Sequence, residues 1–359
     1  MFYREVGDLK TSYRSDQAVL TITQERYAIM GLLAFMYLVI PLIADDFWLN
    51  TIIIPTLIFS LAALGLNILV GYAGLISLGT GGFMGVGAYA CYKLTSIFPD
   101  VNIVIHILLS GFFAAGIGVI FGLPSLRIKG FYLAVATLAS QFFLEWSFGR
   151  IAWLYNYNDS GAIDAVNRTL FSMPLSEPYG DTRFQYLVTL TIVVFLTLVA
   201  INILRGRFGR SWMAIRDMDI AAELIGIRLL PSKLLAFAVS SYYCGVAGAM
   251  LVFLSLGSAE VESFDILNAS FPVLFMVIIG GLGSIIGSFM GAAFIVVLPI
   301  MISTVPRFFE IDINSATVEH IRFMIVGALI IFFLIVEPAG LARLWQIARE
   351  KLRLWPFPH

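Results

Sequence analysis

The amino-acid sequence predicts an all-α integral membrane protein with about ten transmembrane helices, and three bulk properties support this fold class. The chain has 359 residues, of which 60% are hydrophobic and only 13% are charged. Globular chains average about 45–50% apolar and about 25% charged residues. The mean hydropathy of +0.92 points the same way. Because a spanning helix needs about 20 apolar residues, ten spans would use most of the apolar residues and leave no room for a soluble domain.

Glycine, proline and charged residues divide the chain into apolar runs, each close to the 17–25 residues that a hydrocarbon core requires (about 30 Å). Runs 74–94 and 266–283 are rich in Gly and Ser, and run 131–148 is short and carries Glu145. We therefore interpret these three as candidates for broken or re-entrant helices, which occur where backbone faces protein or a water-filled path. The ten predicted runs are 27–44, 49–70, 74–94, 101–123, 131–148, 184–204, 234–256, 266–283, 284–303 and 320–338.

The distribution of charge predicts the orientation, because short loops rich in Lys and Arg stay in the cytoplasm. Ten spans place every basic segment on one side, which gives both termini a cytoplasmic location. The basic segments are residues 1–26, Arg127 with Lys129, the loop 205–233, and the tail 339–359 with Arg343, Arg349, Lys351 and Arg353. The predicted outer loops contain Asp45, Asp46, Asp100, residues 149–183, Glu260, Glu262, Asp265, Glu310 and Asp312. The transmembrane domain accordingly covers residues 27–338.

Several function classes are excluded by what the sequence lacks. A net charge of −1 argues against a nucleic-acid partner. No phosphate-binding loop ending in Gly-Lys-Ser or Gly-Lys-Thr is present, so the chain is not expected to hydrolyse ATP itself. Its three histidines, His106, His320 and His359, are far apart, which predicts neither a metal site nor a catalytic triad. We expect no enzyme activity and no bound cofactor.

Two glycine-rich runs stand out within the spans. The run 280–292 spaces Gly283, Gly287 and Gly291 four residues apart, which predicts a smooth stripe for close helix packing. The run 71–89 holds too many glycines for a simple helix interior. A break in the helix, with backbone groups facing a pathway, would explain the second run, although packing alone remains an alternative for both.

Polar residues inside spans are candidates for a translocation path, because such groups are costly in a bilayer. Gln141 and Glu145 lie one helical turn apart on the same face. Asn67, Ser77 and Thr80 cluster around the expected break in the run 71–89. We predict that these five residues line a solute path, the alternative being hydrogen bonds between helices.

The loop 205–233 mixes apolar and charged residues in a way that predicts a short amphipathic helix outside the bilayer. Ile215, Ala221, Ala222 and Ile225 alternate with charged residues, and Gly226 suits a helix end. Such a helix can lay its apolar side into the groove of a partner protein. The alternative is a helix that rests on the lipid surface.

Four strings in the same order resemble the LivM-type permeases of branched-chain amino acid ABC importers. They are Leu66–Gly79, Gly130–Leu138, the loop Gly209–Gly226, and Gly280–Ser284 with Gly287. The resemblance covers roughly residues 60 to 300. It implies that the loop supplies a coupling helix for an ATPase subunit, with Ile215, Arg216, Ile220, Ala221, Ala222, Glu223 and Gly226 at the contact.

The resemblance also implies partners and a function. The expected partners are a second, LivH-like permease, two cytoplasmic ATPases that use ATP and Mg, and a periplasmic solute-binding protein, all around a chain embedded in the bilayer of a bacterial inner membrane. The predicted function is import of branched-chain or other hydrophobic amino acids by alternating access. The alternatives are the same importer type carrying urea, amides or aromatic acids, and a secondary transporter or channel, for which only Glu145 approaches a mid-membrane carboxylate.

Overall fold

The computed structural model describes residues 23–126, 132–158, 162–165, 169–170, 173–175, 180–308, 315–336 and 339–354. Helices form almost all of this part. The elements up to residue 205 are α2 (Thr23–Ala34), η1 (Phe35–Val39), α3 (Ile40–Ile43), η2 (Trp48–Ile53), α4 (Ile54–Asn67), η3 (Ile68–Tyr72), α5 (Thr80–Ile97), α6 (Ile103–Ser125), α7 (Tyr132–Arg150), β1 (Ile163–Asp164), β2 (Thr169–Leu170), β3 (Met173–Pro174) and α8 (Thr182–Arg205).

The remaining elements begin with two short helices and end with a helix of fifteen residues. They are α9 (Arg207–Asp217), α10 (Asp219–Leu224), α11 (Leu229–Leu251), η4 (Val252–Leu256), β4 (Ser258–Ala259), η5 (Val261–Phe264), η6 (Ile266–Ser270), α12 (Phe271–Gly280), α13 (Ile285–Phe308), α14 (Ser315–Val336) and α15 (Gly340–Leu354). The strands form two antiparallel pairs, β1 with β4 and β2 with β3. The all-helical fold class is confirmed.

Each of the ten predicted apolar runs contains a helix in the structure. Within the described part of the chain, five helices are long and apolar enough to cross a membrane: Trp48–Tyr72, Ile103–Ser125, Thr182–Arg205, Leu229–Leu256 and Ile285–Ile302. Shorter apolar helices cover Tyr27–Ile43, Ile266–Gly280 and Met324–Phe333. The run 131–148, a candidate for a break, is instead one continuous helix, α7.

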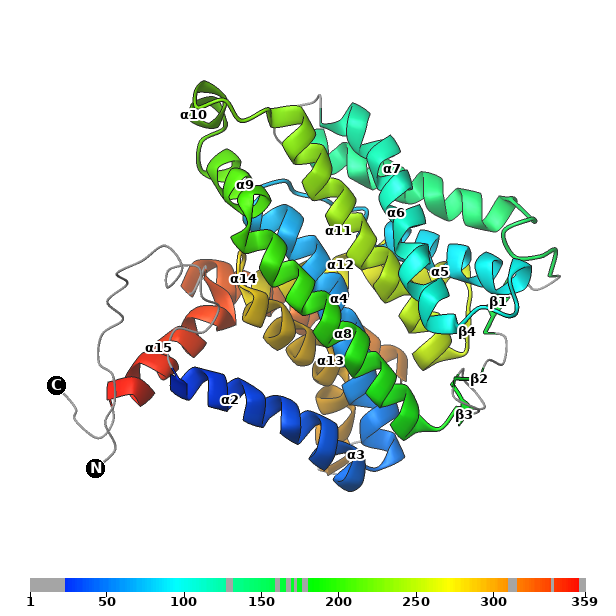
Figure 1. Ribbon diagram of the computed structural model, residues 1–359. Helices are drawn as coiled ribbons and strands as arrows, with labels where there is room; N and C mark the ends of the chain where they lie inside the picture. Colours follow the sequence, from blue (N-terminus) through cyan, green and yellow to red (C-terminus); the bar gives the residue numbers. More distant parts are fainter. Residues whose placement is uncertain are drawn as a thin grey trace.

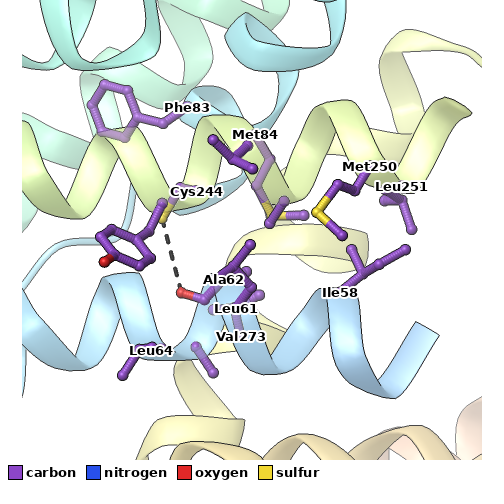
Figure 2. Close-up of a cluster of buried hydrophobic side chains, with 14 of the residues drawn as sticks. Ile58, Leu61, Ala62, Leu64, Phe83, Met84, Cys244, Met250, Leu251 and Val273 are labelled. Atoms are coloured by element: carbon purple, nitrogen blue, oxygen red, sulfur yellow. Dashed lines mark hydrogen bonds between the residues drawn. The ribbon is translucent and has the colours of Figure 1, made fainter. Parts of the chain in front are cut away.

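The core of the bundle lies around α11, which packs against α4, α5 and α6 (Figure 1). Small residues allow these backbones to approach closely: Gly248 of α11 abuts the carbonyl oxygen of Met84, and Gly245 abuts Ala114. In Figure 2, Cys244 and Met250 of α11 lie among apolar side chains of α4 and α5, and the Cys244 thiol donates to the carbonyl oxygen of Ala62 at 3.9 Å. Both cysteines are free and buried.

Two short segments interrupt the helices at glycine-rich positions. Residues 73–79 are not helical, so the helical part of run 74–94 begins only at Thr80. Residues 281–284 separate α12 from α13, and both Gly281 and Gly283 have positive φ, at 114° and 75°. We refer to residues 73–79 as the first break and to residues 281–284 as the second break.

The predicted stripe of three glycines on one helix face needs correction. Gly283 lies in the second break, before α13 begins, and so cannot share a helix face with the other two. Gly287 and Gly291 do lie in α13, where they face the backbone of α12 at Gly280 and Met276. The close contact between α12 and α13 therefore rests on Gly280, Gly287 and Gly291.

The loop 205–233 also differs from the prediction, which gave it one amphipathic helix. The backbone is extended at Met218, with φ −162° and ψ 98°, and divides the segment into α9 and α10. Several predicted features fall on residues outside the described part: residues 1–22, Arg127 with Lys129, Gly130, Asp159–Gly161 within the outer loop 149–183, and Glu310 with Asp312.

Candidate translocation and coupling elements

Helix α5 begins inside the bundle, and side chains from two other elements take over its first backbone donors. The first N–H groups of a helix have no partner within the helix. The Gly81 N–H donates to Ser270 Oγ at 2.8 Å, and the Gly82 N–H donates to Gln141 Oε1. The start of α5 is thereby fixed to α7 and to the end of η6.

Gln141 is the centre of this group. Its side chain is fully buried, and its amide donates to the Phe264 carbonyl oxygen and to Glu145 Oε1, both at 2.7 Å. Its Oε1 also accepts a hydrogen bond from Ser270 Oγ at 3.2 Å. Every polar atom of Gln141 thus has a protein partner, whereas Glu145 is half-buried. Gln141 joins three segments far apart in the sequence.

The structure brings Thr80, Gln141 and Glu145 together at the start of α5. Ser77 lies three residues before Thr80, in the first break. Thr80 and Ser77 are both buried. Ser77 Oγ accepts from the Gly79 N–H at 3.4 Å, and the Leu78 N–H donates to Thr137 Oγ1 at 3.0 Å. Sequence reasoning missed Thr137 and Ser270, although both lie in segments that it had singled out for other features.

Asn67, predicted to lie with Ser77 and Thr80, instead holds the second break. Its side-chain amide donates to the Ser284 carbonyl oxygen and to Ser288 Oγ, both at 2.9 Å. Its Oδ1 accepts from the Gly283 N–H at 2.8 Å, and the residue is fully buried. Two of these hydrogen bonds go to the second break and the third goes to Ser288 in the first turn of α13, so Asn67 fixes that turn against α4.

Arg216 connects α9 to both breaks. Its Nη1 donates to the Gly71 carbonyl oxygen at 2.8 Å, and its Cα, Cβ and Cγ lie beside Gly74, which has a positive φ of 70°. Gly71 in turn packs against the backbone of Gly283. The guanidinium also binds Asp217 Oδ1 at 3.0 Å. A movement of α9 would therefore displace Gly71, Gly74 and the second break.

Helix α9 is anchored to the bundle, whereas α10 projects from it (Figure 1). Trp212 is fully buried and its Nε1–H donates to the Ser232 carbonyl oxygen at 2.9 Å, while Ile215 is also buried. After Gly226, which ends α10 with a φ of 90°, the chain returns to α11. Helix α10 is therefore a short helix that projects from one end of the bundle.

Most of the exposed side chains in α10 and in the residues that flank it are apolar. Ala222 points inward and is 2% exposed, while Ala221, Glu223 and Gly226 are exposed. The exposed apolar side chains are Met218 (66%), Ile220 (71%), Leu224 (84%) and Ile225 (74%). Two of the seven predicted contact residues are buried, Ile215 and Ala222, and the other five are exposed: Arg216, Ile220, Ala221, Glu223 and Gly226. Met218 and Leu224, which the prediction did not include, are exposed as well.

An apolar cavity of about 330 Å³ lies toward the other end of the bundle. It is bounded by α4, by η6 with α12, by α13 and by α14, and its lining includes Phe59, Phe271, Phe275 and Pro299, with Asn268 as a polar residue. Its size falls within the range of about 300–1,000 Å³ seen for small-molecule sites. The cavity could hold an aliphatic group.

Residues 49–334 match the family model of the permease component of the branched-chain amino acid transport system. The chain belongs to this permease family. The permease is 31% identical over 325 residues to the high-affinity branched-chain amino acid transport system permease protein LivM of Escherichia coli K12, covering 83% of this chain and 70% of the relative. LivM of Salmonella typhimurium LT2 is 30% identical with the same coverage.

A more distant relative is the probable branched-chain amino acid transport permease protein LivM of Methanocaldococcus jannaschii, 24% identical over 329 residues, 79% of this chain and 90% of the relative. No solved structure matches the permease. Family membership and the apolar helices make this permease a multi-pass protein of the cell inner membrane.

Proposed function

We propose that the chain is the permease subunit of an ATP-driven importer that carries branched-chain or other hydrophobic amino acids across the membrane by alternating access. In this proposal ten spans in residues 27–338 place both termini in the cytoplasm. The apolar cavity of about 330 Å³ supports a solute with an aliphatic side chain. The names of the curated relatives point to the same class of solute.

The observation that carries the proposal is the connection from α10 through α9 to the two breaks. The exposed apolar residues of α10 suit a groove on a cytoplasmic ATPase. Arg216 then links α9 to Gly71 beside both breaks. Nucleotide-driven movement of the ATPases would reach the spans by this route, with ATP and Mg bound by those partners and no cofactor bound by this chain.

The proposed path passes the start of α5. Thr80 and Glu145 flank that helix start, with Gln141 and Ser270 holding it in place. Asn67 bonds to the second break, and Ser77 lies in the first break. In this proposal both residues also line the solute path. A second, LivH-like permease would complete the path, and a periplasmic solute-binding protein would deliver the solute.

The docking step is tested in the assembled importer by Leu224→Glu, which places a charge at the most exposed apolar position of α10. We expect the ATPase subunits to dissociate during purification and solute-stimulated ATP hydrolysis to be lost. Leu224→Met, which keeps an apolar side chain there, should behave as wild type. Unchanged ATPase binding in Leu224→Glu would refute docking at α10.

The transmission step is tested by Arg216→Ala, which removes the hydrogen bond to Gly71 without touching the exposed face of α10. The ATPases should stay bound while solute no longer stimulates hydrolysis. Arg210→Ala, which removes an exposed cation of the same helix, is the matched control and should behave as wild type.

A separate measurement tests the alternative function. Solute uptake by liposomes that contain this chain alone would support a secondary transporter or channel.

A further inference from the structure

Helix α15 carries an apolar stripe that the rest of the described structure does not cover. Leu341, Leu344, Trp345 and Ala348 follow the 3–4-residue spacing of one helix face. Leu341 packs against the core, but Leu344 is 49% and Trp345 46% exposed. A stripe of this kind is stable only against a further apolar surface.

The first turn of α15 is fixed to the second break. Gly340, with φ 64°, abuts the backbone of Ile279 and Gly281, and Ala342 is 7% exposed. A Cβ at Gly281 would lie 2.9 Å from the Ala342 Cβ. The helix therefore starts at the same end of the bundle as α9 and α10. From there it leaves the bundle in a direction that is not parallel to α8 or α11 (Figure 1).

The charge of α15 identifies the surface that it fits. Its sequence holds Arg343, Arg349, Lys351 and Arg353 against a single acidic residue, Glu350. By contrast, the stretch Arg216–Gly226 holds three acidic residues and one basic residue. A basic amphipathic helix with an aromatic residue, at the end of a membrane bundle, is typical of an interfacial helix on anionic lipid.

We propose that α15 lies on the membrane surface, with Leu344 and Trp345 at the boundary between headgroups and acyl chains and Lys351, beside the stripe, near anionic phospholipid headgroups. The proposal rests on the membrane location of the chain and is independent of the transported solute. Because the first turn of α15 abuts Gly281, binding of α15 to lipid would also restrict movement of the second break.

A depth measurement on the full-length chain in nanodiscs tests this placement. A fluorophore is attached to Leu344→Cys, on the stripe, or to Gln346→Cys, on the opposite side; the two native cysteines are buried. The discs contain phosphatidylcholine alone or with phosphatidylglycerol, plus a headgroup-labelled nitroxide lipid. We expect the fluorophore at position 344 to be quenched more in anionic discs than in neutral ones, and more than that at position 346.

Two results would overturn the proposal. Equal quenching at both positions, or at both lipid compositions, would show that α15 does not lie on anionic lipid. Shielding of position 344 that arises only when ATPase subunits are added would assign the stripe to a protein partner.

A charge variant gives an independent test. One basic residue near an anionic surface changes the binding equilibrium about fivefold. Lys351→Gln changes an exposed position. In anionic discs it should reduce the ratio of membrane-bound to unbound α15, measured by quenching at position 344, about fivefold, whereas Lys351→Arg should not. No difference between these two variants would refute the electrostatic part of the proposal.

Discussion

The core around α11 and the two breaks satisfy their backbone groups in different ways. In α4, α5, α6 and α11 the backbone hydrogen bonds run within helices, and glycines let neighbouring backbones touch. At the breaks and at the helix ends next to them, side chains from distant segments bond to the backbone groups: Asn67, Thr137, Gln141, Arg216 and Ser270. Packing between helix backbones holds the first region, whereas the second region adds a small number of side-chain hydrogen bonds to close contacts such as that of Gly71 with Gly283.

This difference indicates where the permease can change conformation. Sliding α5 along α11 would force backbone atoms at Gly87 and Gly245 into one another. A turn held by Asn67 or Arg216 can exchange one acceptor for another at little cost, because each hydrogen bond contributes only about 0.5–3 kcal/mol. We therefore expect the helices around α11 to move as one body and the breaks to act as its joints.

The largest effect is expected in the core, from Gly248→Val. A Cβ at Gly248 would overlap the carbonyl oxygen of Met84, and a backbone atom cannot move aside as a side chain can. Overpacking of this kind should cost more than about 3 kcal/mol. The measurement is the amount of folded protein in detergent and its thermal unfolding temperature.

The control for this substitution is Gly116→Val in α6, where a Cβ would meet nothing within 4 Å. Both variants place valine in a helix, so the helix propensity cost is shared. Gly248→Val that is as stable as Gly116→Val would mean that α5 and α11 are not tightly packed.

A smaller effect is expected at the start of α5, next to the first break, from Gln141→Leu. The substitution keeps the bulk of the side chain but leaves the Gly82 N–H and the Phe264 carbonyl oxygen without this partner. The expected loss of stability is about 1–3 kcal/mol, measured by thermal unfolding in detergent.

Glu145→Gln distinguishes a structural role of Glu145 at the start of α5 from a role on the solute path. The amide introduced by this substitution keeps a carbonyl oxygen that can accept from Gln141, so stability should stay within about 0.5 kcal/mol of wild type. A change in uptake in this variant alone would place Glu145 on the solute path. Unchanged uptake kinetics would limit Gln141 and Glu145 to holding α5.

The helices were predictable from the sequence because hydropathy and length dictate them, as the ten apolar runs show. The pairing of Gln141 with Glu145 was also predictable, since a four-residue spacing places two side chains on one face of α7. Local patterns therefore identified most elements and one pair within the candidate site.

Contacts between distant segments were not predictable. Asn67 bonds to residues more than 200 positions away, so its own neighbourhood pointed to the wrong break. The spacing of Gly283 from Gly287 indicated one helix face only if the helix continued, and the positive φ at Gly283 ends that continuity. An extended backbone at Met218 likewise divides α9 from α10, and the local charge pattern did not indicate this interruption.

Of the two glycine positions, Gly283 has the smaller expected effect, and Gly283→Ala compares the two regions most directly. At Gly283 a Cβ would lie 3.4 Å from Arg216 Nη1, an ordinary contact, so the cost is only that of a left-handed backbone. That cost is roughly 1–2 kcal/mol for alanine and smaller for asparagine, which adopts this conformation more readily. Gly283→Asn should therefore be more stable than Gly283→Ala in thermal unfolding. A loss in Gly283→Ala as large as that in Gly248→Val would mean that the second break is packed as rigidly as the core, and it could not then serve as a joint.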